Sequence, residues 1–138
     1  MPNPTHFARP GPEPGTPPIL NVPGLGNSGP DHWQSRWEAR YPWFRRVELG
    51  LWDNPDRNLW VERLDAEIRR AGQPVILVAH SLGCVAVAWW AAVHGWGYRD
   101  PVAGALLVAP ADPDHALAPP ADAGFPSLKA VAGFAPLP

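Results

Sequence analysis

The sequence predicts an α/β fold, a three-layer sandwich in which helices cover both faces of a mostly parallel sheet. Short apolar runs alternate along the chain with longer segments whose apolar residues recur every three or four positions, the respective patterns of strands and helices. The run at residues 75–79 is continuously apolar, as expected for a strand buried on both faces. Turns that contain glycine follow two of the runs, at residues 24–29 and 80–83.

Strands and helices are expected to alternate, beginning and ending with a strand. The strands are expected at residues 18–22, 44–49, 74–79 and 102–108, and the helices at residues 30–41, 56–71 and 82–94. Pro30 and Asp31 should open the first helix, because proline suits the first turn and aspartate favours the positive end of the helix dipole. Trp33 and Trp37 lie four residues apart and form an apolar stripe expected to pack on the sheet.

Later boundaries are set by residues that start or stop helices. Asn54 is expected to cap the second helix, with Pro55 in its first turn and Gly72 after its end. The third helix should follow directly from the apolar run at residues 75–79. Beyond the last strand, from Pro110 onward, no clear element is expected until residues 125–131.

Composition limits the kind of protein. The chain of 138 residues suits one domain, and we expect residues 1–17 to be a disordered proline-rich tail and residues 18–138 to be the folded domain. A net charge of −2 without a basic stripe argues against nucleic acid as a partner. No apolar run has the roughly 18–20 residues that span a membrane, and the N-terminus lacks a signal peptide. Together with a single cysteine, these features indicate a cytoplasmic protein.

Ser81 stands in the pattern that is typical of a nucleophile elbow. Ala79 and Gly83 are small residues two positions before and after it, and the segment joins a buried strand to a helix. Such a turn exposes the serine hydroxyl at the C-terminal edge of a parallel sheet. The competing interpretation is that Ser81 simply caps the helix that begins at Leu82.

The first glycine turn has the spacing Gly24-x-Gly26-x-x-Gly29, which also fits a dinucleotide-binding loop. That interpretation is disfavoured because Pro30 stands at the expected helix start and the next strand does not end in a clear acidic residue for a ribose. Since ligands of such sheets bind beyond the C-terminal strand ends, the two glycine turns should form one site.

Several short motifs in order resemble the small serine hydrolases of the retinoblastoma-binding-protein-nine/YdeN family, within the α/β-hydrolase superfamily. The resembling segments lie at residues 22–28, 31–33, 52–55, 79–83 and 109–113. The resemblance implies an α/β-hydrolase-like sheet, incomplete at its C-terminus, and a hydrolase that acts on a small-molecule ester, thioester or amide. We expect no cofactor and no metal for such a hydrolase.

The resemblance also implies roles for individual residues. Ser81 would be the nucleophile, and the backbone N–H groups of Leu82 and Leu25 would form the oxyanion hole. His32, Trp33 and Trp52 would lie near the substrate. The competing interpretation places His32 and Trp33 at a helix N-terminus with a packing tryptophan, and tryptophans such as Trp52 are more often core residues.

The sequence departs from the family in one respect, because the segments in which the family carries the aspartate and histidine of its triad are missing. His115 is the best stand-in for the base and Asp112 for its acid, although the favoured interpretation of His115 is a solvated loop residue. We therefore expect weak or absent turnover. The alternative is a non-catalytic interaction protein or gene fragment that self-associates through an exposed sheet edge near residues 102–108.

Overall fold

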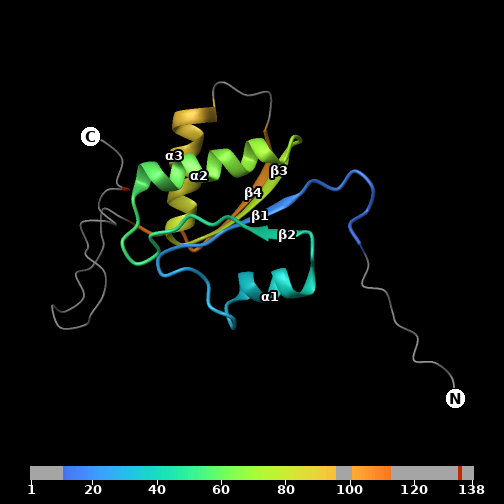
Figure 1. Ribbon diagram of the computed structural model, residues 1–138, viewed down its shortest axis with the longest axis horizontal. Helices are drawn as coiled ribbons and strands as arrows, with labels where there is room; N and C mark the ends of the chain where they lie inside the picture. Colours follow the sequence, from blue (N-terminus) through green and yellow to red (C-terminus); the bar gives the residue numbers. More distant parts are fainter. Residues whose placement is uncertain (1–10, 96–100, 113–133, 135–138) are drawn as a thin grey trace, which may run out of the picture.

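The computed structural model describes residues 11–95, 101–112 and 134, and the elements in these ranges form the predicted three layers. The strands are β1 (Ile19–Val22), β2 (Phe44–Arg46), β3 (Val75–His80) and β4 (Val102–Val108), and the helices are α1 (Trp33–Arg40), α2 (Arg57–Arg70) and α3 (Leu82–His94). All strand pairs are parallel. Helix α1 lies on one face of the sheet and α2 and α3 lie on the other, so the predicted fold class is confirmed (Figure 1).

The strand order β2-β1-β3-β4 places a topological switch point between β1 and β3. From β1 the chain moves outward to β2 and then returns to the other side of β1, so the connections leaving β1 and β3 diverge. Ligands of open α/β sheets bind in the crevice at such a point, beyond the C-terminal strand ends. The segment after β1 is the Gly24–Gly29 turn, and the segment after β3 is Ser81. The sheet therefore brings the two predicted glycine turns to one edge.

Strand β2 is shorter than the predicted 44–49. Regular pairing ends at Arg46, although Val47 N–H still donates to Asn21 O (2.9 Å). Val47 and Leu49 are fully buried, and Gly50 has a positive φ of 71°. The apolar alternation at these positions thus marks a buried connection to α2 rather than a continuing strand.

Helix α1 begins three residues later than predicted. Pro30 and Asp31 lie in a turn, closed by a hydrogen bond from His32 N–H to Gly29 O (3.0 Å), and His32 is the N-cap. Its ring nitrogen Nδ1 accepts a hydrogen bond from Gln34 N–H (3.2 Å). A side-chain acceptor at this position satisfies a first-turn N–H that has no partner within the helix, so the cap residue sets the start of α1.

The predicted stripe of Trp33 and Trp37 is not the face that α1 buries. Gln34 is the buried residue of the helix, with no exposed surface, whereas Trp37 is 36% exposed. Trp33 and Trp37 instead pack edge to face on each other (ring centroids 4.9 Å apart), and Trp37 also contacts Phe44 at the sheet edge. The interface between α1 and the sheet is consequently polar at its centre.

Helix α2 is capped by Asp56, not by the predicted Asn54. The carboxylate of Asp56 accepts a hydrogen bond from Leu59 N–H (2.8 Å), and the buried Pro55 precedes the cap. Gly72 follows the helix with a φ of 65°, as its predicted role in ending the helix requires. Helix α3 and strand β4 have the predicted bounds.

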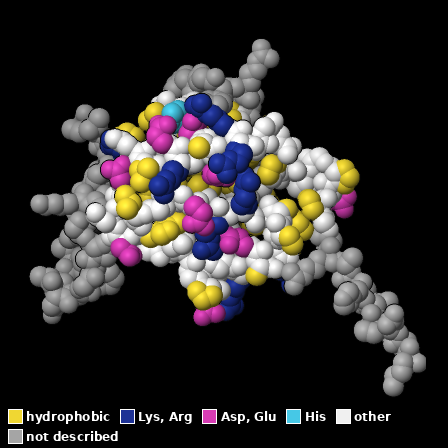
Figure 2. All heavy atoms as spheres, viewed as in Figure 1, with side chains coloured by type: hydrophobic (Ala, Val, Ile, Leu, Met, Phe, Trp, Pro, Cys, Tyr) yellow, Lys and Arg dark blue, Asp and Glu magenta, His cyan; other side chains and the backbone are white. Residues whose placement is uncertain are grey.

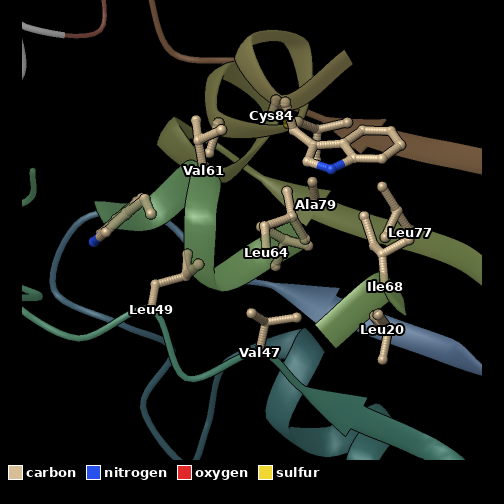
Figure 3. Close-up of a cluster of buried hydrophobic side chains, with 14 of the residues drawn as sticks. Leu20, Val47, Leu49, Val61, Leu64, Ile68, Leu77, Ala79 and Cys84 are labelled. Atoms are coloured by element: carbon tan, nitrogen blue, oxygen red, sulfur yellow. The ribbon is translucent and has the colours of Figure 1, made fainter. Parts of the chain in front are cut away.

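The apolar core lies between the sheet and the pair of helices α2 and α3. Leu20 and Leu77 point from the strands toward Leu64 and Ile68 of α2 (Figure 3). Figure 2 shows acidic and basic side chains interspersed on the face in view, without a continuous basic stripe. Among the described residues, no helix is both long enough and apolar enough to cross a bilayer.

Strand β4 forms the outer edge of the sheet within the described residues. Leu106 pairs with Val78 and Leu107 with Ala79, so the two leucines point to opposite faces, and each is 45% exposed. Residues 1–10 of the predicted tail, the segment at residues 125–131 and His115 lie outside the described residues. Residues 11–17 form no helix or strand.

Candidate active site

Ser81 occupies a sharp turn between β3 and α3. Its backbone angles, φ 53° and ψ −120°, lie in a region that residues other than glycine seldom adopt. Ser81 N–H donates to Val108 O (3.1 Å), and Ser81 O accepts from Ala111 N–H (3.2 Å) and Cys84 N–H (3.0 Å). These bonds tie the turn to the end of β4. The surrounding chain therefore holds Ser81 in a strained conformation, a feature that is concentrated at functional sites.

The side chain of Ser81 does not cap helix α3. It makes no capping hydrogen bond, and a cap residue usually has extended backbone angles, unlike those of Ser81. The helix-cap interpretation of this serine is therefore wrong. The Ser81 side chain is half-buried, and among the described residues it forms no capping hydrogen bond with α3.

Two glycines allow the backbone segments around Ser81 to approach each other. A Cβ on Gly24 would lie 3.0 Å from His80 O, 3.1 Å from Leu82 N and 3.1 Å from the Ser81 Cβ. A Cβ on Gly83 would overlap the carbonyl oxygens of Val22 and Pro23. These contacts explain why a small residue is needed at Gly83, as the sequence motif predicted. The end of β1 passes directly over the start of α3.

The Gly24–Gly29 turn is fixed by backbone bonds on both sides. Asn27 N–H donates to Gly24 O (3.1 Å), and Gly26 N–H donates to Trp52 O (2.8 Å). Within the described part of the chain, no backbone carbonyl accepts a hydrogen bond from Leu25 N–H or Leu82 N–H. Leu82 is the first residue of α3, where N–H groups lack partners within the helix and carry the positive end of the dipole. This corner can therefore offer donors to an oxygen atom.

His32 and His80 lie against each other beside the turn. Their ring centroids are 4.7 Å apart, and Trp33 contacts both rings. Burial, the neighbouring His80 and the charge of Arg46 all lower the pKa of His32. A neutral imidazole that accepts at Nδ1 carries its proton on Nε2. His32 thus presents a donor to its surroundings, and its basic nitrogen is engaged in the helix cap, as the competing interpretation of this residue held.

Of the remaining predicted site residues, Trp52 and Asp112 lie in the described part of the chain and His115 lies outside it. Trp52 is half-buried, packs edge to face on Trp60 (5.7 Å between centroids) and supports the turn through its carbonyl oxygen. Asp112 is exposed, shortly after the end of β4. His115 lies outside the described residues, so its pairing with Asp112 stays a prediction.

His94 lies at the far end of α3, about 18 Å from the first residue at 1.5 Å per residue. Its Nε2 contacts the Glu62 carboxylate (3.0 Å), and Asp65 lies close by. Oxygen and nitrogen atoms of these three side chains lie within 4.8 Å of one another, a spacing that could hold a metal ion. However, Asp65 already binds Arg69 (2.8 Å) and Trp90 Nε1–H (3.0 Å). The cluster is therefore explained as a contact between α2 and α3.

A group of polar residues that the sequence analysis did not single out lies under the glycine turn. We call Asn21, Ser28, Gln34, Glu38 and Arg46 the polar layer. Arg46 binds both carboxylate oxygens of Glu38 (2.9 and 3.0 Å), and Gln34 accepts a hydrogen bond from the Ser28 hydroxyl (2.7 Å). One signal was present in the sequence: Asn21 interrupts an apolar strand that a parallel sheet buries on both faces.

Comparison with known proteins agrees with this geometry. The model of the serine hydrolase family matches residues 19–138. A solved structure from Pectobacterium atrosepticum, described as a YdeN-like hydrolase, superposes with a TM-score of 0.62 at 38% sequence identity. The match covers 70% of this chain and 50% of that one, so the chain spans about half the length of this relative. No curated protein matches the sequence.

Proposed function

Because this chain belongs to the serine hydrolase family, we propose that Ser81 is its nucleophile and that carboxylic esters, thioesters or amides are its substrates. The observation that carries the proposal is the approach of Gly24 to Ser81 and to Leu82 N on a strained turn. A half-buried serine on such a turn, next to the N–H of Leu82 at the start of α3, supports acyl transfer as its chemistry.

In the proposed reaction, Ser81 Oγ bonds to the carbonyl carbon while its proton passes to a base. The carbonyl oxygen becomes negatively charged and is stabilised by Leu82 N–H and Leu25 N–H. When the carbonyl forms again, the bond to the leaving alcohol, thiol or amine breaks and the leaving group takes up the proton. Water then repeats the sequence on the acyl-enzyme and releases a carboxylic acid.

We further propose that turnover by this chain is weak. The nitrogen of His32 that could take a proton is occupied by Gln34 N–H, and His94 is held by Glu62 at the far end of α3. Removal of a triad partner costs several orders of magnitude in rate, although an oxyanion hole and substrate binding retain about 10³–10⁴-fold over water. The candidates for the base and its acid that the sequence analysis favoured are His115 and Asp112.

A fluorophosphonate probe tests the nucleophile directly. Ser81 Oγ should bond to phosphorus while the P–F bond breaks and fluoride leaves, so peptide mapping by mass spectrometry should find the adduct on Ser81. The Ser81→Ala variant and the urea-unfolded wild type should stay unlabelled, because the reaction needs both the hydroxyl and the folded turn. A folded wild-type chain that remains unmodified after prolonged exposure would contradict the proposed role of Ser81.

A second candidate function, a non-catalytic protein that self-associates, is favoured by the exposure of Leu106 and Leu107 on opposite faces of β4. Residues 102–108 contain no charged side chain, so a second copy of β4 could pair with this edge without opposing like charges. Sedimentation analysis of wild type and Leu107→Lys tests whether the chain self-associates through this edge. A concentration-dependent dimer that the substitution abolishes supports this candidate, and a wild-type monomer removes it.

A further inference from the structure

We propose that Gln34 is a positioning residue, whose side-chain amide holds the Gly24–Gly29 turn in register with the nucleophile turn; this inference rests on the proposed function of Ser81. The amide joins three backbone segments. Nε2 donates to Val22 O (3.3 Å), two residues before Gly24, and to Val78 O (3.0 Å), three residues before Ser81. Oε1 accepts from the Ser28 hydroxyl (2.7 Å), near the end of the turn. These three bonds are the Gln34 clamp.

The clamp spans both sides of the crevice in which the proposed oxyanion hole lies. Leu25 belongs to the segment between Val22 and Ser28, and Leu82 follows shortly after Val78. The distance between the two donor N–H groups therefore depends on how the glycine turn sits against β3. Gln34 is fully buried and uses both donors and its acceptor, so its side chain has no freedom to adapt if one partner moves.

Further hydrogen bonds from β1 and β2 hold the clamp in place. Asn21 Nδ2–H donates to Gln34 O (3.1 Å), which anchors the backbone of the clamp residue to β1. Arg46 donates to Ser28 O (2.8 Å) and to Asn27 Oδ1 (3.2 Å), so the outer part of the turn is also tied to β2. Each of these residues acts on the turn and none lies in the apolar core.

The energetics favour a positioning role over a purely stabilising one. Asn21 Oδ1 is buried and has no hydrogen-bond partner among the described residues. An unsatisfied buried acceptor costs about 1–3 kcal/mol, and an incompletely satisfied polar network is less stable than apolar packing of the same volume. A helix whose only task is to cover the sheet would be more stable with apolar residues at these positions. The polar layer instead gives the glycine turn one defined position.

The test compares wild type with Gln34→Met, which keeps the length of the side chain and removes all three bonds of the clamp. The matched control is Trp90→Phe, which removes one buried hydrogen bond, to Asp65, on the opposite face of the sheet. Two quantities are measured for each protein: hydrogen exchange of the amides at residues 24–29, and the rate constant and apparent affinity for phosphonylation of Ser81.

For Gln34→Met we expect at least about tenfold faster exchange in the glycine turn, and at least about a tenfold lower maximal phosphonylation rate with little change in apparent affinity. Trp90→Phe should change neither quantity. If Gln34→Met fails to fold, Ser28→Ala breaks one bond of the clamp and should change both in the same direction. If the folded variant had the same exchange rates and the same phosphonylation rate as wild type, the inference would be overturned.

The two proposals can fail separately. If wild type itself resists the probe, the role of Ser81 is contradicted, and hydrogen exchange alone then decides whether Gln34 holds the turn. If wild type is labelled but Gln34→Met reacts equally fast, the nucleophile stands and the positioning role of Gln34 is wrong. A uniform rise of exchange across α2 and α3 in Gln34→Met would likewise reject it, because such a pattern reports global destabilisation.

Discussion

Gly24 lies so close to Ser81 that a Cβ on the glycine would be 3.1 Å from the Cβ of the serine. The first glycine of the turn thus serves the approach of two protein segments. In a dinucleotide-binding loop the first glycine permits the tight turn, and the second lets the backbone approach the pyrophosphate at the start of a helix. Here α1 begins only at Trp33, with its cap position filled by His32, so the geometry favours a hydrolase-type crevice.

Substitution of Gly24 should impair the site more than substitution of Gly29 at the end of the turn. Gly24→Ala brings a methyl group to 3.0–3.1 Å from His80 O, Leu82 N and Ser81, two of them backbone atoms that cannot easily move. We expect a loss of about 1–3 kcal/mol in the free energy of unfolding and much slower phosphonylation of Ser81. The control is Gly29→Ala, since a Cβ there meets nothing within 4 Å. Equal behaviour of the two variants would contradict the close approach.

The strained backbone of Ser81 predicts an unusual effect on stability. Ser81→Gly should raise the free energy of unfolding by about 1 kcal/mol or more, because glycine adopts φ 53° without the strain of a side chain. Ser81→Ala should be close to neutral, since no capping bond is lost. Urea unfolding of the three proteins measures both effects. A loss of about 1 kcal/mol in Ser81→Ala would indicate a capping role after all.

His32 should make the stability of the fold depend on pH. Burial and neighbouring His80 and Arg46 lower its pKa, so the unfolded chain binds the proton more strongly than the folded chain. The stability that neutral His32 contributes is fully present above the pKa of the unfolded chain, about 6.5, and is lost as pH falls from there through the pKa of the folded chain. His32→Asn keeps a capping acceptor that does not titrate. Denaturant unfolding should show that the free energy of unfolding falls less between pH 7.5 and pH 5 in the variant than in wild type. An equal fall in both proteins would refute the assignment of this pH dependence to His32.

Arg46 should not be replaceable by lysine. Its guanidinium binds Glu38 through two nitrogens and also reaches Ser28 O and the Ser35 hydroxyl, a pattern that one ammonium group cannot reproduce. We expect Arg46→Lys to lower the free energy of unfolding by about 1–3 kcal/mol.

The neighbouring residue provides the control for this substitution. Arg45 is half-exposed and makes one ion pair, with Glu67 (3.3 Å). Arg45→Lys should therefore change stability by no more than about 0.5 kcal/mol. If both substitutions had the same small effect, the contacts of Arg46 would contribute little to the polar layer.

Prediction from the sequence was most accurate for elements that are almost entirely apolar or whose ends are marked by small residues. Strand β3 and helix α3 have continuous apolar or strongly apolar sequences, and the small residues around Ser81 encode the turn between them. The glycine turn was found for the same reason, because close backbone approach demands glycine whatever else the chain does. The strained turn at Ser81 and the glycine turn that faces it could thus be located without coordinates.

Helix α1 was misjudged because its pattern departs from the usual rule that apolar residues are buried. Gln34 faces the sheet because Ser28 and two carbonyl groups satisfy its amide, and these partners lie outside α1, between 6 and 44 residues away. Its start was misplaced because histidine is a rare cap, so Pro30 and Asp31 gave the stronger local signal. Hydrogen bonds that cross from α1 to β1, β2 and β3 leave no periodic trace in the sequence.

The most direct test of the proposed site is a crystal structure of the chain after reaction with a fluorophosphonate. We predict phosphorus bonded to Ser81 Oγ, with the phosphoryl oxygen within hydrogen-bonding distance of both Leu25 N–H and Leu82 N–H. An adduct on a different residue, or a phosphoryl oxygen directed away from the Gly24–Gly29 turn, would contradict the proposed arrangement of nucleophile and oxyanion hole.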